Sequence, residues 1–136
     1  MQLRPLWMCL LLIFFMLMLV LGAVPGNADA LSDRFGDKPL HLLAYSCMAA
    51  LCFHSLRGRR LPQSLISLLI IALLGLIDEL VQSLLPYRNA SLIDWCFDIA
   101  AAIVVIIFMN LFAPAATKIP SACEKKSAKP FFLSQD

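Results

Sequence analysis

Residues 65–85 read LISLLIIALLGLIDELVQSLL, an apolar run in which the first charged pair, Asp78-Glu79, comes only near the end. A helix that crosses a bilayer needs about 20 mostly apolar residues, because each residue advances the helix by about 1.5 Å. The run meets that length, and its two adjacent carboxylates are costly to place in lipid. It therefore predicts a membrane-spanning helix that ends in an ionisable group.

Two apolar segments precede this run. Residues 6–24 contain no charge and stop at Pro25-Gly26, where a helix is expected to end. Residues 40–56 form a shorter segment that is interrupted by two histidines and a tyrosine. We expect each of the two segments to form a helix that crosses the membrane.

A further apolar segment and a polar tail follow residues 65–85. Residues 92–112 are apolar apart from two aspartates and an asparagine, and Pro114 stops the segment. The sequence therefore predicts an all-α integral membrane protein, with four transmembrane helices in one domain of residues 1–114. Residues 115–136 are polar, and we expect them to form a disordered cytoplasmic tail.

The composition agrees with a membrane protein. Hydrophobic residues make up 61% of the chain and charged residues 15%, with a mean hydropathy of +0.84. A soluble domain is typically about 45–50% apolar and about 25% charged. The net charge of +2 is too small to indicate nucleic acid as a partner. None of the five cysteines forms a CxxC pair, so we interpret those in the apolar runs as packing residues.

The first segment has a second interpretation. The basic N-terminus, the apolar stretch and the sequence Ala28-Asp29-Ala30 resemble a cleavable signal peptide. The apolar run is longer than the usual 7–15 residues of a signal peptide, which favours a retained helix. In both cases the next helix begins outside the cytoplasm.

The distribution of cations predicts the orientation. Short loops rich in Lys and Arg stay in the cytoplasm. Residues 56–61 hold three arginines, residues 115–136 hold four lysines, and Arg4 lies at the N-terminus. The loop 25–39 has two cations against three aspartates, and the loop 86–91 has one arginine. These biases are all satisfied when both termini are cytoplasmic.

This orientation gathers polar residues of three helices at the outer end of the bundle. Residues four apart lie on one face of a helix, as His41 and Tyr45 do, and as Asp94 and Asp98 do. Three polar faces at one depth indicate one shared cluster in the bundle interior. The predicted cluster consists of Asp37, Lys38, His41, Tyr45, Glu79, Gln82, Arg88, Asp94 and Asp98. Asp78 lies in the same polar arc and is a poorer match to the pattern described next.

The polar elements resemble those of the VanZ-like membrane proteins. That family has an Asp-Lys followed by a His near the second helix and a Glu-x-x-Gln near the end of the third. A Pro-x-Arg loop and an Asp-x-x-x-Asn-x-x-Gly that enters the fourth helix follow. Here the four elements read Asp37-Lys38-Pro39-Leu40-His41, Glu79-Leu80-Val81-Gln82, Pro86-Tyr87-Arg88 and Asp94-Trp95-Cys96-Phe97-Asp98. The resemblance covers about residues 36–105.

Two positions depart from the family pattern. Asp98 stands where the family usually has Asn, and Ala101 stands where it usually has Gly. The first change adds a carboxylate, and the second removes the closest helix approach that glycine allows. The resemblance implies a multi-pass protein of the bacterial inner membrane. The namesake of the family is linked to low-level resistance to the glycopeptide teicoplanin.

The sequence supports three hypotheses for the function. The first is a protein that acts at the outer membrane face on cell-envelope components, with membrane lipids and a lipid-linked precursor as partners. The second is an intramembrane transferase or hydrolase on a lipid-linked substrate, with His41 or Glu79 as the catalytic acid or base. The third is a small oligomeric transporter, which fits less well because transport sites usually lie near the bilayer midplane.

Two further expectations concern the chemistry of the cluster. A single histidine among carboxylates is a weak metal motif, so no metal or other cofactor is expected. A purely structural alternative also stays open, in which the charges only lock the helices together.

Overall fold

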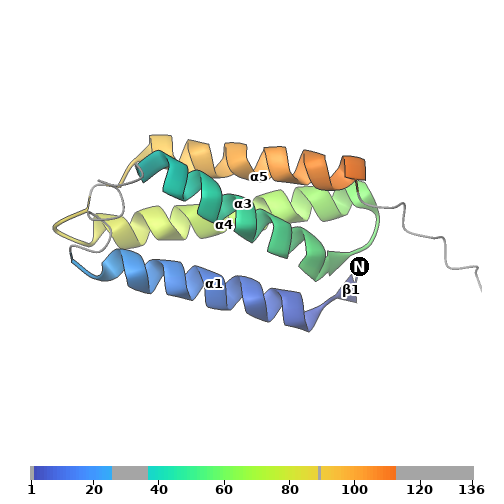
Figure 1. Cartoon of the computed structure of the whole chain (residues 1–136), viewed down its shortest axis with the longest axis horizontal. Helices are drawn as coiled ribbons and strands as arrows, with labels where there is room; N and C mark the ends of the chain where they lie inside the picture. Colours follow the sequence, from blue (N-terminus) through green and yellow to red (C-terminus); the bar gives the residue numbers. More distant parts are fainter. Residues whose placement is uncertain (1, 26–36, 89, 113–136) are drawn as a thin grey trace, which may run out of the picture.

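The computed structural model describes residues 2–25, 37–88 and 90–112, and for Asp37 the backbone only. These residues form four long helices that lie lengthwise in one bundle (Figure 1). The helices are α1 (Pro5–Ala23), α3 (Asp37–Ser55), α4 (Arg60–Ser83) and α5 (Leu92–Phe112). The predicted all-α architecture is confirmed. The expected signal-peptide site at 28–30 and the tail at 115–136 lie outside the described residues.

The starts of α3 and α4 are compatible with the prolines near them. Helix α5 has the predicted bounds, whereas α3 starts at Asp37 and α4 at Arg60, several residues before the apolar runs begin. Pro39 and Pro62 lie in the first turns of these two helices. The first backbone N–H groups of a helix have no intrahelical acceptor, so proline is tolerated there. The polar residues before each apolar run can therefore be helical.

A two-stranded antiparallel pair, which the sequence did not indicate, joins the chain start to the α3–α4 connection. Strand β1 (Gln2–Leu3) pairs with β2 (Leu56–Arg57), with Gln2 opposite Arg57. The Arg4 N–H also donates to the Ser55 carbonyl at 2.7 Å. Arg4 and the arginines that follow α3 therefore lie at the same end of the bundle.

The opposite end holds the site. There the ends of α1 and α4 meet the starts of α3 and α5, on the left in Figure 1. The Tyr87 hydroxyl, in the α4–α5 loop, donates to the Ala23 carbonyl at the end of α1. Helix α3 contacts each of the other three helices, so its residues supply much of the interior.

Apolar side chains fill the middle of the bundle and also cover its outside. The buried core includes Leu11, Phe15, Met48, Cys52, Ile71 and Ala102. Large apolar side chains are exposed on every helix, among them Leu12, Leu43, Leu69 and Val104. An exterior of this kind suits lipid and not water.

Three of the helices, α1, α4 and α5, are long and apolar enough to cross a membrane. Helix α3 is as long as α1, at 19 residues, but carries more polar side chains. Two of these, His41 and Tyr45, are buried against the neighbouring helices. The structure therefore supports a membrane protein with transmembrane helices, and the enclosed position of α3 explains how it accommodates polar groups.

Candidate functional site

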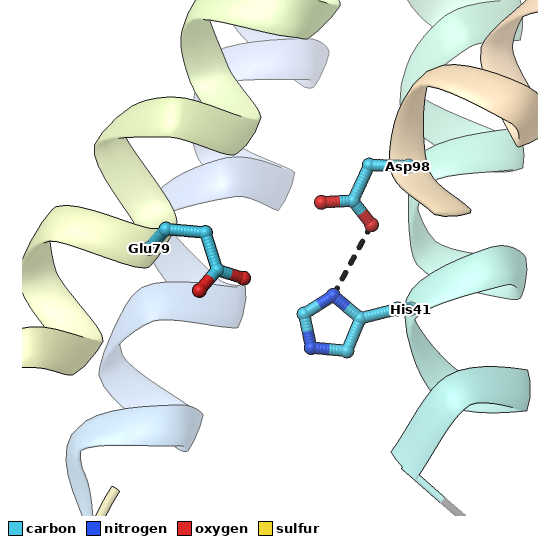
Figure 2. Close-up of side chains that lie close together, drawn as sticks. All are labelled: His41, Glu79 and Asp98. Atoms are coloured by element: carbon cyan, nitrogen blue, oxygen red, sulfur yellow. Dashed lines mark hydrogen bonds and ion pairs between the residues drawn. The ribbon is translucent and has the colours of Figure 1, made fainter. Parts of the chain in front are cut away.

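Three ionisable residues from three helices meet inside the bundle. His41 lies one turn after the start of α3, Glu79 one turn before the end of α4, and Asp98 near the second turn of α5. One ligand atom from each lies within 4.8 Å of the others, and the side chains point toward one another in Figure 2. Their exposed fractions are 8%, 5% and 0%. We call His41, Glu79 and Asp98 the buried triad.

His41 is held by partners on two sides. Its Nδ1 and Asp98 Oδ1 share a hydrogen bond of 3.1 Å, which the dashed line in Figure 2 marks. The ring of Tyr45, one turn along α3, lies parallel to the imidazole with 6.0 Å between ring centroids. A carboxylate that accepts from one ring nitrogen fixes the orientation of the imidazole. The sequence assigned this orienting role to no residue on α5.

Glu79 is tied to the start of α5. The Ser91 backbone N–H donates to Glu79 Oε2 at 2.6 Å. The Ser91 carbonyl in turn accepts from the backbone N–H groups of Asp94 and Trp95, at 3.0 and 3.2 Å. Ser91 therefore begins α5 and simultaneously fixes the Glu79 carboxylate. This contact depends on the loop conformation, which residue spacing does not encode.

Asp78 also belongs to the interior, although it was the weaker candidate in the sequence. It is 5% exposed, and the Tyr45 hydroxyl donates to its Oδ2 at 3.3 Å. Asp78 and Glu79 are adjacent and so project about 100° apart on the helix. Both are buried because this end of α4 faces α3 and α5. The sequence did contain a signal for the burial of Asp78. It is the pair of adjacent acids, together with a tyrosine that follows the histidine by one helical turn.

Gly75, one turn before Glu79, lets α4 and α5 approach closely. A Cβ atom at Gly75 would lie 3.0 Å from Trp95 Cδ1 and 3.2 Å from Asp98 Oδ2. The Trp95 indole N–H donates to the Ala72 carbonyl at 2.9 Å. The close approach of α4 and α5 at this level therefore depends on a glycine of α4. Trp95 lies beside the triad as a result.

The other predicted residues lie around the triad. The Arg88 guanidinium donates to Gln82 Oε1 at 3.2 Å. Lys38 is exposed, with its Nζ 5.4 Å from the centre of the Phe97 ring. Asp94 is half-buried at the start of α5. The Asp37 side chain lies outside the described residues.

Two carboxylate oxygens of the triad have no hydrogen-bond partner among the described residues. They are Glu79 Oε1 and Asp98 Oδ2, and both are fully shielded from solvent. Most buried polar atoms in proteins have a partner, and each exception calls for an explanation. An arrangement with free acceptor atoms can bind a proton donor or a cation, because an unpaired buried polar group is costly in a low-dielectric interior.

Comparison of the chain with protein-family models, with curated proteins and with solved structures finds no match.

Proposed function

We propose that the chain is a VanZ-like protein of the bacterial inner membrane that acts at the outer face on cell-envelope or lipid-linked components. The support from sequence is the order of the polar elements between Asp37 and Asp98. The single observation that carries the proposal is the buried triad, which places ionisable groups from three helices at one end of the bundle.

The proposed orientation has four spans and both termini in the cytoplasm. Helix α3 would be the fourth span, because it matches α1 in length and runs between the same two ends of the bundle. Arg4 and Arg57 lie near the paired strands at one end, which suits the cytoplasmic side. The triad, at the other end, then faces the outside.

The surroundings of the triad suit an anionic or amide-bearing headgroup. Arg88 is half-buried and Lys38 exposed near the same end, so both can offer positive charge to a ligand. Gln82 adds an amide beside Arg88. The middle of the interior is apolar, which disfavours a transport path through the bundle.

A second candidate is an intramembrane transferase or hydrolase. The observation that favours it is the 3.1 Å contact between His41 and Asp98, which orients an imidazole as in general acid–base catalysis. Glu79 would supply the second acid–base group, 4.8 Å or less from the other two.

The test compares two variants of the site with one variant at the other end. Overexpressed wild-type protein should change the susceptibility of a bacterial host to teicoplanin. Glu79→Gln and Arg88→Ala should abolish that change while membrane abundance, measured by quantitative immunoblotting, stays near normal. Arg59→Ala, an exposed position at the start of α4, should keep the full effect.

Two results would contradict the proposal. One is a full effect in both site variants at normal abundance. The other is a fall in the effect that only follows a fall in abundance, which would favour a structural role. Reporters fused after Arg59 and after Arg88 provide the orientation control, since only the second should be active outside the cytoplasm.

A further inference from the structure

The donor atoms of the buried triad are arranged as metal ligands. They comprise an imidazole nitrogen and oxygens of two carboxylates, all within 4.8 Å of one another. Zinc binds histidine nitrogen and carboxylate oxygen at about 2.0–2.2 Å, so two neighbouring ligand atoms of a tetrahedral site lie about 3.4 Å apart. His41 Nδ1 and Asp98 Oδ1, at 3.1 Å, are already close to that separation. Glu79 supplies the third ligand atom, within 4.8 Å of the other two.

The unpartnered oxygens supply an independent indication. Glu79 Oε2 accepts from the Ser91 N–H, which holds the carboxylate in place and leaves Oε1 without a partner in the described part of the chain. Asp98 Oδ1 faces His41, and Asp98 Oδ2 likewise has no hydrogen-bond partner in the described part of the chain. In Figure 2 both carboxylates point into the space between α4 and the His41 ring. Glu79 is anchored through Oε2 and presents Oε1, whereas a metal ion between His41 and Asp98 would take the place of the proton that these two side chains share.

The charges at this end of the bundle also call for a cation. Three buried acids, Asp78, Glu79 and Asp98, lie together there. The described cations near this end are Lys38, which is exposed over the Phe97 ring, and Arg88, which donates to Gln82 Oε1, while His41 is charged only if it is protonated. Buried charges in proteins are paired or bound to metals, because an unpaired ion loses its hydration. If the acids are ionised, positive charge is missing from the described residues of this region.

We infer that His41, Glu79 and Asp98 bind one divalent transition-metal ion, Zn²⁺ or Mn²⁺, inside the outer end of the bundle. The imidazole suits Zn²⁺ and the two carboxylates also suit Mn²⁺, whereas Mg²⁺ and Ca²⁺ prefer all-oxygen sites. Three protein ligands leave a coordination position for water or a ligand, as in catalytic zinc sites. The inference departs from the sequence-based expectation of no metal and does not depend on the proposed function.

The main experiment measures binding of the metal alone. The full chain is purified in detergent with an affinity tag that contains no histidine, stripped with EDTA and titrated with Zn²⁺, Mn²⁺ or Mg²⁺ by calorimetry. Bound metal is counted by mass spectrometry. We expect one Zn²⁺ or Mn²⁺ per chain and no Mg²⁺.

Matched variants identify the ligands. Mutation of a residue that hydrogen-bonds to a metal ligand typically lowers the metal affinity by about 10–100-fold. Mutation of a ligand itself should therefore lower the metal affinity by at least about 100-fold. We expect this loss in His41→Gln and Asp98→Asn. His54→Gln should bind as the wild type does, because His54 is exposed near the opposite end, beside Trp7.

A second measurement does not require the ligand variants to fold. Trp95 and Asp98 are three residues apart on α5 and both lie against Gly75, whereas Trp7 is on the first part of α1. In a Trp7→Phe variant the remaining indole fluorescence comes from Trp95 alone, since the chain has two tryptophans. Added Co²⁺ should quench this fluorescence saturably, and excess Zn²⁺ should restore it.

The inference is overturned if folded wild-type protein binds none of these ions, which would mean that protons neutralise the acids. It is equally overturned if His41→Gln binds as tightly as the wild type, or if Co²⁺ leaves the Trp95 fluorescence unchanged.

Discussion

The interior of the bundle differs between the half near the paired strands and the half near the α4–α5 loop. The first half is filled by side chains such as Met48, Cys52 and Ile71, which have no charge to satisfy. The second half holds the buried triad together with Asp78. The same four helices thus enclose an apolar interior along one part of their length and an ionisable interior along the other.

The hydrogen bonding of polar groups also differs between the two halves. At the strand end, the Gln63 amide donates to the Phe53 carbonyl at 2.8 Å, and the Asn110 amide donates to Ser64 Oγ at 2.8 Å. These bonds tie neighbouring helices together with neutral groups. At the loop end, carboxyl groups are buried, and two of their oxygens have no partner among the described residues; the apolar half has one such atom, the neutral Ser67 Oγ. From the ionisable groups of the second half we expect that the apolar half supplies stability and the ionisable half serves a ligand.

The largest loss of stability is expected for a substitution in the apolar half. Phe15→Ala removes a ring that is 2% exposed and packs in the core between α1 and the rest of the bundle. Phe→Ala costs about 3–5 kcal/mol in soluble cores, and lipid reduces the transfer part, so we expect a loss of about 2–3 kcal/mol.

The matched control lies on the same helix. Leu12 is 47% exposed, so Leu12→Ala should change the unfolding free energy by less than about 0.5 kcal/mol. Unfolding in mixed detergent micelles measures both. Equal losses in the two variants would mean that α1 is not packed as the structure has it.

An intermediate effect is expected at Gly75, where the two halves meet. An added Cβ would contact Trp95 and Asp98 at 3.0 and 3.2 Å, whereas a Cβ at Gly22 would meet nothing within 4 Å. Overpacking costs about 1–3 kcal/mol, part of which the better helix propensity of alanine offsets. Gly75→Ala should therefore be at least about 1 kcal/mol less stable than Gly22→Ala in the same unfolding measurement. The reverse order would show that α4 and α5 can separate at no cost.

The sequence predicted the helices better than their connections. The bounds of α5 follow from an apolar run between Ser91 and Pro114, but the start of α4 was hidden because Gln63 and Ser64 are polar. Those residues are helical, and their side chains bond to neighbouring helices. The two short strands have no sequence pattern, since they form only where the chain start meets the end of α3.

The site was predictable only in part, for the same reason. Four-residue spacing placed His41, Glu79 and Asp98 on inward faces, and the structure brings them together. Spacing could not show that Asp98 contacts His41, that Ser91 fixes Glu79 or that Arg88 turns to Gln82. Those contacts depend on helix rotation and loop conformation.

The smallest effect, and the most direct test of the account, is expected for the triad itself. Asp98→Asn and Glu79→Gln keep the size of each side chain and an acceptor for His41 or Ser91. The measurement is the unfolding free energy of the two variants and the wild type, in mixed micelles with EDTA so that metal does not contribute. If the triad serves a ligand, both variants should be within about 0.5 kcal/mol of the wild type or more stable, because functional charges are retained at the expense of stability. A loss of about 3–5 kcal/mol, which is typical when one partner of a buried charge pair is removed, would show instead that the triad is a structural lock.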